Sequence, residues 1–125
     1  MLSNKTPIAT IAVKSLDEAR GFYEGKLGFD PVPAEMGHVL NYRSGASNLL
    51  VYESQFAGSN QATAATFVVG PDLDRIVANL KAKGVVFEHY DMPGVNREGD
   101  IHVSGEIRNA WLKDPDGNII SLVGA

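Results

Sequence analysis

Two stretches of the chain share one alternation of apolar and polar residues. Residues 9–13 (Ala-Thr-Ile-Ala-Val) are echoed 56 positions later by residues 65–69 (Ala-Thr-Phe-Val-Val), and short β-branched runs of this kind predict strands. After each run the apolar spacing lengthens to three or four residues, which predicts an amphipathic helix. The same offset places Gly28 on Gly84, and each glycine is expected to end its helix. The sequence therefore predicts two halves with one plan.

A hairpin is predicted after each helix. Residues 39–43 and 49–53 flank one turn, and residues 109–113 and 118–123 flank Asp-Pro-Asp-Gly at 114–117, which is typical of a turn and not of a catalytic site.

The second half is longer than the first. Asn48 and Asn118 both follow a turn and lie 70 positions apart, because the second half contains a longer segment, 90–105. Its length and glycines favour a flap over a cleft. The predicted fold class is α+β, with two βαβββ modules, about 6–54 and about 62–125, in a single domain over 1–125 whose curved mixed sheet forms the cleft.

Composition excludes several classes of protein. Of 125 residues, 44% are hydrophobic and 21% charged, which is typical of a globular fold. The absence of cysteine excludes disulfides, thiolate metal sites and a cysteine nucleophile. A net charge of −4 without a basic cluster argues against nucleic acid, and no apolar run approaches the roughly 20 residues that span a bilayer. We expect a cytoplasmic protein with neither nucleic acid nor membrane as partner.

Two motifs carry a family resemblance. A strand leads into Ser-Leu-Asp-Glu-Ala at 15–19, followed by Phe-Tyr at 22–23 and Leu-Gly at 27–28, and the chain ends with Lys-Asp-Pro-Asp-Gly-Asn at 113–118. In this order the chain resembles the vicinal oxygen chelate superfamily of glyoxalases, extradiol dioxygenases and bleomycin-resistance proteins, over nearly its whole length. The resemblance implies paired modules around a cleft. It also implies a homodimer, in keeping with the open sheet edges that two modules leave.

The resemblance also indicates where a metal would be held. Metal-using members of the family take ligands from the first and last strands of each module, positions that correspond here to Ile8, Ala64, Val51 and Ser121. A bound divalent ion needs about three His, Glu, Asp or Cys donors, and these positions supply one serine. Glu53 shares a strand face with Val51, but one carboxylate makes no site. We therefore expect neither a metal nor another cofactor.

Strand alternation predicts a mostly apolar cleft with a few polar groups. Tyr42 is expected to pair with Leu49 across the first hairpin, on a face that also carries His38. Trp111 lies between two residues that are assigned to the cleft, so strand alternation directs it to the opposite face. It is therefore predicted to lie in the core. The candidate ligand-binding residues are Thr10, Ala12, His38, Tyr42, Val51, Glu53, Thr66, Leu112 and Ser121, with Arg97 and His102 from the segment 90–105.

Two functions remain open from these residues. An apolar cleft with a few polar groups suits a small hydrophobic or aromatic organic molecule, which a bleomycin-resistance-like protein would bind without a catalytic metal. The alternative is a glyoxalase-like or dioxygenase-like enzyme. Such an enzyme would use a metal site aligned differently, or would be a metal-free lyase or isomerase in which His38 acts with Glu53 or Tyr42 as acid and base.

Overall fold

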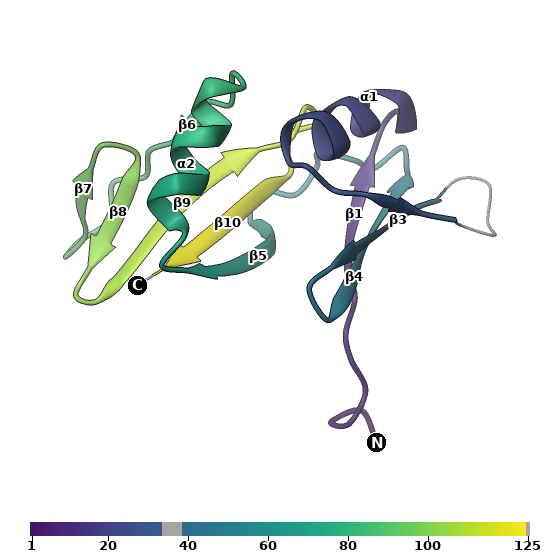
Figure 1. Ribbon diagram of the computed structural model, residues 1–125, viewed down its shortest axis with the longest axis horizontal. Helices are drawn as coiled ribbons and strands as arrows, with labels where there is room; N and C mark the ends of the chain where they lie inside the picture. Colours follow the sequence, from purple (N-terminus) through teal and green to yellow (C-terminus); the bar gives the residue numbers. More distant parts are fainter. Residues whose placement is uncertain (34–38, 125) are drawn as a thin grey trace.

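The computed structural model describes residues 1–33 and 39–124 (Figure 1). Its elements confirm the predicted α+β class and the order of strand, helix and strands in each half. The first module contains β1 (Ala9–Val13), α1 (Leu16–Arg20), η1 (Gly21–Lys26), β2 (Pro31–Val32), β3 (Val39–Ser44) and β4 (Ser47–Glu53). The second contains β5 (Thr63–Gly70), α2 (Leu73–Ala82), β6 (Phe87–Glu88), β7 (Asn96–Glu98), β8 (Ile101–Ser104), β9 (Ile107–Lys113) and β10 (Ile119–Gly124).

Each module has its own sheet, and the two sheets share one strand order. The first runs β1-β4-β3-β2 and the second β5-β10-β9-β8-β7, with β6 also paired to β9. The first and last strands of each module pair in parallel, because a helical crossover returns the chain to the same end of the sheet. Strands β7 and β8 lie within the segment 90–105, so this part of the segment extends the second sheet and does not form the predicted flap.

The helices end at the glycines that the sequence predicts. Ser15 Oγ accepts a hydrogen bond from the backbone N–H of Glu18 at 3.4 Å and so caps α1, which continues into the π-helical turn η1. Gly28 and Gly84 follow the two helices with φ of 79° and 88°, the left-handed conformation that glycine adopts most readily. Asp72 precedes α2 and makes no side-chain capping bond. Among the described residues, no helix is long and apolar enough to cross a membrane.

One face of each sheet is covered by the helix of its own module, and the core lies on that face. In the first module Leu49 and Val51 are at most 1% exposed, and Tyr42 stacks on Tyr23 of η1 with 6.3 Å between ring centroids. In the second module α2 lies across β9 and β10 (Figure 1) and covers buried residues such as Leu112. We call these the helix faces and the opposite sides the open faces.

The turn between β9 and β10 connects the two modules through a buried carboxylate. Asp114, 4% exposed, accepts hydrogen bonds from Tyr23 Oη at 2.8 Å, Asn118 Nδ2 at 2.7 Å, and the backbone N–H groups of Asp116 and Asn118 at 2.9 and 2.8 Å. Asn118 Nδ2 also donates to the carbonyl of Ala12 in β1 at 2.7 Å. Burial and the Asp114 charge raise the pKa of Tyr23 well above its usual range, so the phenol stays a donor. The predicted turn therefore also bridges the modules.

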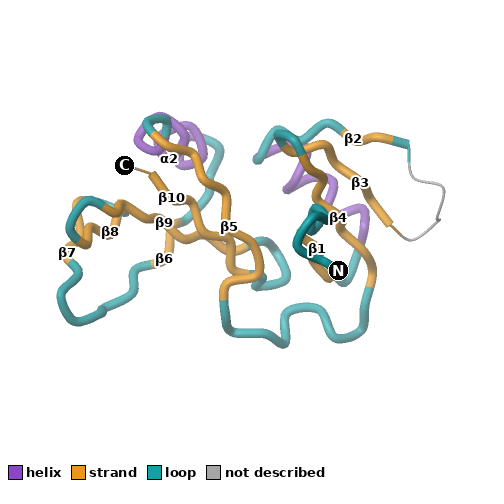
Figure 2. Tube along the Cα trace, turned by 90° about the horizontal axis from the view of Figure 1, so that it is seen from below, coloured by secondary structure: helices purple, strands orange, loops and turns teal. Residues whose placement is uncertain are grey.

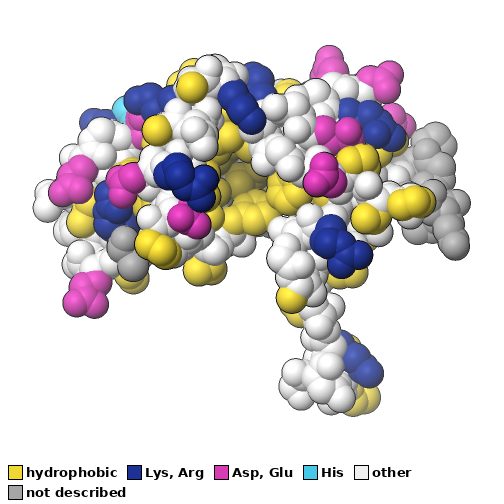
Figure 3. Space-filling model, in the orientation of Figure 1, with side chains coloured by type: hydrophobic (Ala, Val, Ile, Leu, Met, Phe, Trp, Pro, Cys, Tyr) yellow, Lys and Arg dark blue, Asp and Glu magenta, His cyan; other side chains and the backbone are white. Residues whose placement is uncertain are grey.

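The segment 54–62 links the modules and lies against the same turn (Figure 2). Gly58 has φ of 75°, and a Cβ at this position would collide with the backbone carbonyl of Asp116, so glycine is required on both counts. A second connection is apolar, since the rings of Phe29 and Phe67 lie 5.8 Å apart between the modules. Beside them an apolar hollow of about 160 Å³ remains between α2 and the end of η1 (Figure 3).

We expect Tyr23→Phe to lower the free energy of unfolding by about 1.5–3 kcal/mol, because the variant removes a hydrogen bond to a buried charged group. Urea denaturation followed by circular dichroism measures the change. Tyr52→Phe is the matched control, because Tyr52 is 38% exposed and surface changes usually stay within about 0.5 kcal/mol. Equal losses in the two variants would contradict the role assigned to the bridge between the modules.

Candidate functional site

Strand pairing decides which side chains of the first module lie on its open face. β1 pairs with β4 so that Thr10 is opposite Leu50, and Ala12 is opposite Tyr52. Directly paired residues point to the same side of a sheet, and Val51, the neighbour of Leu50, therefore points to the helix face. Contrary to the prediction, Val51 does not line the open face with Thr10 and Ala12.

Two further candidates of the first module also lie on the helix side. Tyr42 is fully buried and donates a hydrogen bond to Glu24 Oε2 at 2.8 Å; burial, followed by this bond, raises the pKa of Tyr42 well above its usual range. Glu53 Oε1 accepts a hydrogen bond from the backbone N–H of Leu16 at 3.4 Å, at the start of α1. The prediction that these two side chains face the open side is therefore wrong. His38 lies outside the described residues, and its role stays a prediction.

In the second module the pairing reverses the predicted places of two neighbours. Ser121 is opposite Trp111 in β9 and opposite Thr66 in β5, so these three residues share the open face. Leu112 has no exposed surface and points to the helix face, and Trp111 is not the core residue that was predicted. Lys113 is opposite Ile119, so residues 114–118 lie between the two strands and the turn is one residue longer than Asp-Pro-Asp-Gly. Counting outward from 114–117 alone places residue 111 opposite residue 120, which explains why the prediction put it on the wrong face.

The open face of the second module carries an aromatic cluster, which we define as Tyr90, His102 and Trp111. The ring centroids of His102 and Trp111 lie 4.8 Å apart, those of Tyr90 and Trp111 5.3 Å, and those of Tyr90 and His102 6.2 Å. His102 belongs to β8 and is opposite Asn109, which lies two residues from Trp111 and hence on the same face. The segment that the sequence assigned to a flap therefore supplies two of the three rings.

Two polar atoms of the aromatic cluster are buried without a partner. His102 is 2% exposed and its Nε2 accepts a hydrogen bond from the backbone N–H of Tyr90 at 2.9 Å. His102 Nδ1 and Tyr90 Oη are the side-chain atoms of the described part of the chain that are buried and have no hydrogen-bond partner. Burial and the charge of Glu88 raise the pKa of Tyr90, against an opposing effect of Lys113. The Tyr90 phenol is therefore protonated at neutral pH.

A hollow of about 380 Å³ lies beside the aromatic cluster, and we call it the linker hollow. Lys113 and Ile119 line it from the sheet, Tyr90 lines it from the segment after β6, and Gly58, Asn60 and Gln61 line it from the linker between the modules. Lys113 and Ile119 are opposite each other and two residues from Trp111 and Ser121, which places them on the open face. The Lys113 ammonium lies 3.4 Å from a carboxylate oxygen of Glu88.

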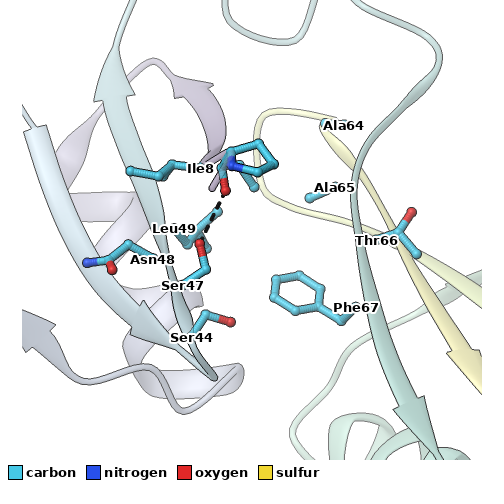
Figure 4. Close-up of a pocket in the computed structure, with 11 residues that line it drawn as sticks. Ile8, Ser44, Ser47, Asn48, Leu49, Ala64, Ala65, Thr66 and Phe67 are labelled. Atoms are coloured by element: carbon cyan, nitrogen blue, oxygen red, sulfur yellow. Dashed lines mark hydrogen bonds between the residues drawn. The ribbon is translucent and has the colours of Figure 1, made fainter. Parts of the chain in front are cut away.

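A second hollow, of about 420 Å³, lies between the modules (Figure 4). It brings together Ile8 and Ala64, the two first-strand positions at which the family resemblance places metal ligands. The ring of Phe67 points into this space, and Ser47 Oγ donates to the carbonyl of Pro7 at 3.2 Å. None of the side chains that line it is titratable, so it offers volume but no acid or base and no His, Asp, Glu or Cys ligand for a metal.

Arg97 lies at the outer edge of the second sheet and not in the linker hollow. It is exposed, donates to the carbonyl of Gly99 at 3.0 Å and approaches His89 Nε2 at 3.4 Å. His89 and Lys81 both contact Asp100, at 2.7 and 2.8 Å, and these bonds lower the pKa of Asp100, Lys81 having the larger effect. Arg97 thus belongs to a charged surface cluster.

The glyoxalase/bleomycin resistance protein/dioxygenase superfamily model matches residues 6–122. The chain belongs to this superfamily. The resemblance seen in the sequence is thereby confirmed. A search of curated proteins gave no match.

Several solved structures share the fold at low sequence identity. A lactoylglutathione lyase from Agrobacterium tumefaciens is 16% identical with a TM-score of 0.71, and the match covers 100% of this chain and 96% of the lyase chain. The fosfomycin resistance protein FosX from Listeria monocytogenes is 19% identical with a TM-score of 0.67, and the match covers 100% of this chain and 93% of the FosX chain. A glyoxalase/bleomycin resistance protein/dioxygenase from Alicyclobacillus acidocaldarius is 19% identical with a TM-score of 0.71, and the match covers 97% of this chain and 91% of that protein's chain.

The residues of this superfamily member do not fit a metal at the expected positions. Leu50 and Ser121 are opposite the equivalent residues Thr10 and Thr66, so the modules match here with an offset of 71 and the fourth position is Leu50 in place of Val51. The Ser121 hydroxyl is already bonded to the side chain of Asn109, at 2.9 and 3.1 Å. In residues 1–33 and 39–124, no three His, Asp or Glu side chains are grouped closely enough to hold a metal ion.

We expect the purified protein to contain far less than one Zn, Ni, Fe, Mn or Mg ion per chain by elemental analysis. A chelator should leave its melting temperature unchanged, because a bound ion that stabilises the folded state would be lost on chelation. A stoichiometric ion, or a clear fall in melting temperature with chelator, would overturn this assignment.

Proposed function

We propose that the protein binds a small hydrophobic or aromatic organic molecule, without a catalytic metal, in the linker hollow on the open face of the second module. The observation that carries the proposal is the position of the aromatic cluster beside a hollow of about 380 Å³. This volume falls in the range of roughly 300–1,000 Å³ found for small-molecule sites.

The side chains around the linker hollow suit such a ligand. The buried Ile119 and the half-buried Tyr90 supply apolar surface, and each buried CH₂ of a ligand contributes roughly 0.8 kcal/mol. Asn60 and Gln61 supply amides that can orient a polar group. The ligand would therefore be held by apolar contacts and positioned by a few hydrogen bonds.

The acid–base alternative has weaker support in this geometry. Its proposed partners Tyr42 and Glu53 both lie on the helix side, where Tyr42 is buried under η1 and Glu53 accepts a bond from the N-terminal backbone of α1. A general acid or base must come within hydrogen-bond reach of the reacting atom. Those two groups lie on the helix face of the first sheet, whereas the linker hollow lies on the open face of the second sheet.

We expect α-methylstyrene, a flat aromatic hydrocarbon, to bind with a measurable heat in titration calorimetry. Gln61→Phe should weaken this binding by at least about tenfold, or ~1.4 kcal/mol, because the added ring occupies part of the hollow. Gln55→Phe is the matched control, since Gln55 is an exposed linker residue that does not line the hollow. Absence of binding, or the same weakening in both variants, would refute the proposed site.

We also propose that the protein forms a homodimer. Strand β5 lies at an edge of its sheet, and Val68 on its open face is 83% exposed; an unpaired edge beside an apolar side chain favours association. Light scattering should return twice the chain mass of 13.4 kDa.

Val68→Asp should shift the particle toward the monomer, because it places a charge in the contact. Val86→Asp, at a position 78% exposed beyond α2, should leave the mass unchanged. A monomer at all protein concentrations would contradict the homodimer.

A further inference from the structure

We infer that the apolar hollow between α2 and the end of η1 is a separate ligand site, which takes a hydrocarbon group of about the size of a benzene ring. The hollow is lined by helix-face residues of the second sheet such as Leu112, whereas the linker hollow lies on the open face. The inference therefore goes beyond the function proposed above and does not depend on it.

The side chains that line the apolar hollow are all hydrocarbon. The first module supplies Leu27 and Phe29, β5 supplies Phe67 and Val69, α2 supplies Ile76, and β9 and β10 supply buried aliphatic residues. A polar group enclosed there would lose its hydrogen bonds to water and find no partner on these side chains. The lining therefore selects a hydrocarbon group.

Partly exposed apolar side chains gather at this hollow. In the described part of the chain, seven apolar side chains pack against the core while they remain partly exposed, and five of them line the hollow. Figure 3 shows hydrophobic side chains together in this depression. A ligand that covers them removes apolar surface from water, which is the main driving force for association.

The volume of the apolar hollow sets the size of the group that it takes. The hollow measures about 160 Å³, and an engineered cavity of about 150 Å³ lined by Leu, Ile and Phe stays dry and binds benzene or xenon. Sites for whole drug-sized molecules measure roughly 300–1,000 Å³. The hollow therefore matches a single ring.

Aromatic packing holds one wall of the hollow in place. The ring centroid of Phe29 lies 5.6 Å from that of Tyr42, 6.4 Å from that of Tyr23 and 5.8 Å from that of Phe67. Tyr23 and Tyr42 are fully buried, and each donates a hydrogen bond to a carboxylate. The wall is thus formed before a ligand enters, and a preorganised site loses less affinity to ordering.

Benzene is the probe for this site. In NMR spectra of the unaltered protein, nuclear Overhauser effects should connect the benzene protons with methyl groups of Leu27 and Ile76, which belong to different modules. Benzene should also raise the melting temperature, because it binds the folded state.

Pyrazine tests the chemical class of the ligand, because it has the shape of benzene with a nitrogen at each end of the ring. At least one nitrogen enters the hollow whichever end leads, and it exchanges its hydrogen bond with water for contact with carbon. Pyrazine should therefore bind at least about fivefold more weakly than benzene, the equivalent of ~1 kcal/mol.

Val69→Phe should weaken benzene binding at least about tenfold, because the added ring occupies part of the hollow, and an aromatic residue suits a strand. Val86→Phe is the matched control, since Val86 is 78% exposed and does not line the hollow; it should leave benzene affinity unchanged. Circular dichroism checks that both variants keep the fold, and the contacts measured on the unaltered protein do not depend on either variant.

Four results would overturn the inference. No contact of benzene with Leu27 and Ile76 would remove the site. Contact with Tyr90 alone would place benzene in the linker hollow, which would support the proposed function and refute the separate site. Equal affinity for pyrazine would contradict the hydrocarbon class. A fall in particle mass to that of one chain in Val69→Phe, measured by light scattering, would show that a second copy covers the hollow.

Discussion

The buried carboxylate of Asp114 is the interaction on which the arrangement of the two modules depends. It accepts bonds from η1 and from the turn that contains it, while Asn118 of the same turn donates to β1. A buried charge is tolerable only when its bonds are satisfied, and removing any donor therefore weakens the contact between the modules. The turn consequently fixes both the β9–β10 register and the position of the first module against it.

The candidate site follows from that turn. With residue 113 opposite residue 119, Trp111 and Ser121 are directed to the open face, and the adjacent strand β8 brings His102 next to Trp111. Gly58 packs against the backbone of Asp116, which holds the linker where Asn60 and Gln61 close the hollow. The turn at 114–117 therefore positions both the candidate site and the contact between the two modules.

Superfamily membership and the side chains at the site lead to different expectations about chemistry. Metal-using relatives need several ionic or imidazole ligands, whereas Ile8, Leu50, Ala64 and Ser121 supply none that can hold a divalent ion. The open face instead carries the aromatic cluster, of which Tyr90 lines the linker hollow. Such a surface recognises an organic molecule by contact and hydrogen bonding, which is the basis of the binding function proposed here.

The sequence by itself determined the two-module plan, both helices with their glycine ends, and the poor metal-ligand set, because these depend on local periodicity and on side-chain chemistry. It placed Tyr42 opposite Leu49 correctly, since a hairpin register follows from its turn. It misplaced Val51 because the face of β4 is set by pairing with β1, a partner distant in sequence. It misplaced Leu112 and Trp111 because the turn after β9 is one residue longer than 114–117, and a shift of one residue in register reverses every side chain. Only the tertiary structure brought Tyr90 and His102 to Trp111, since β6, β8 and β9 meet through long-range pairing.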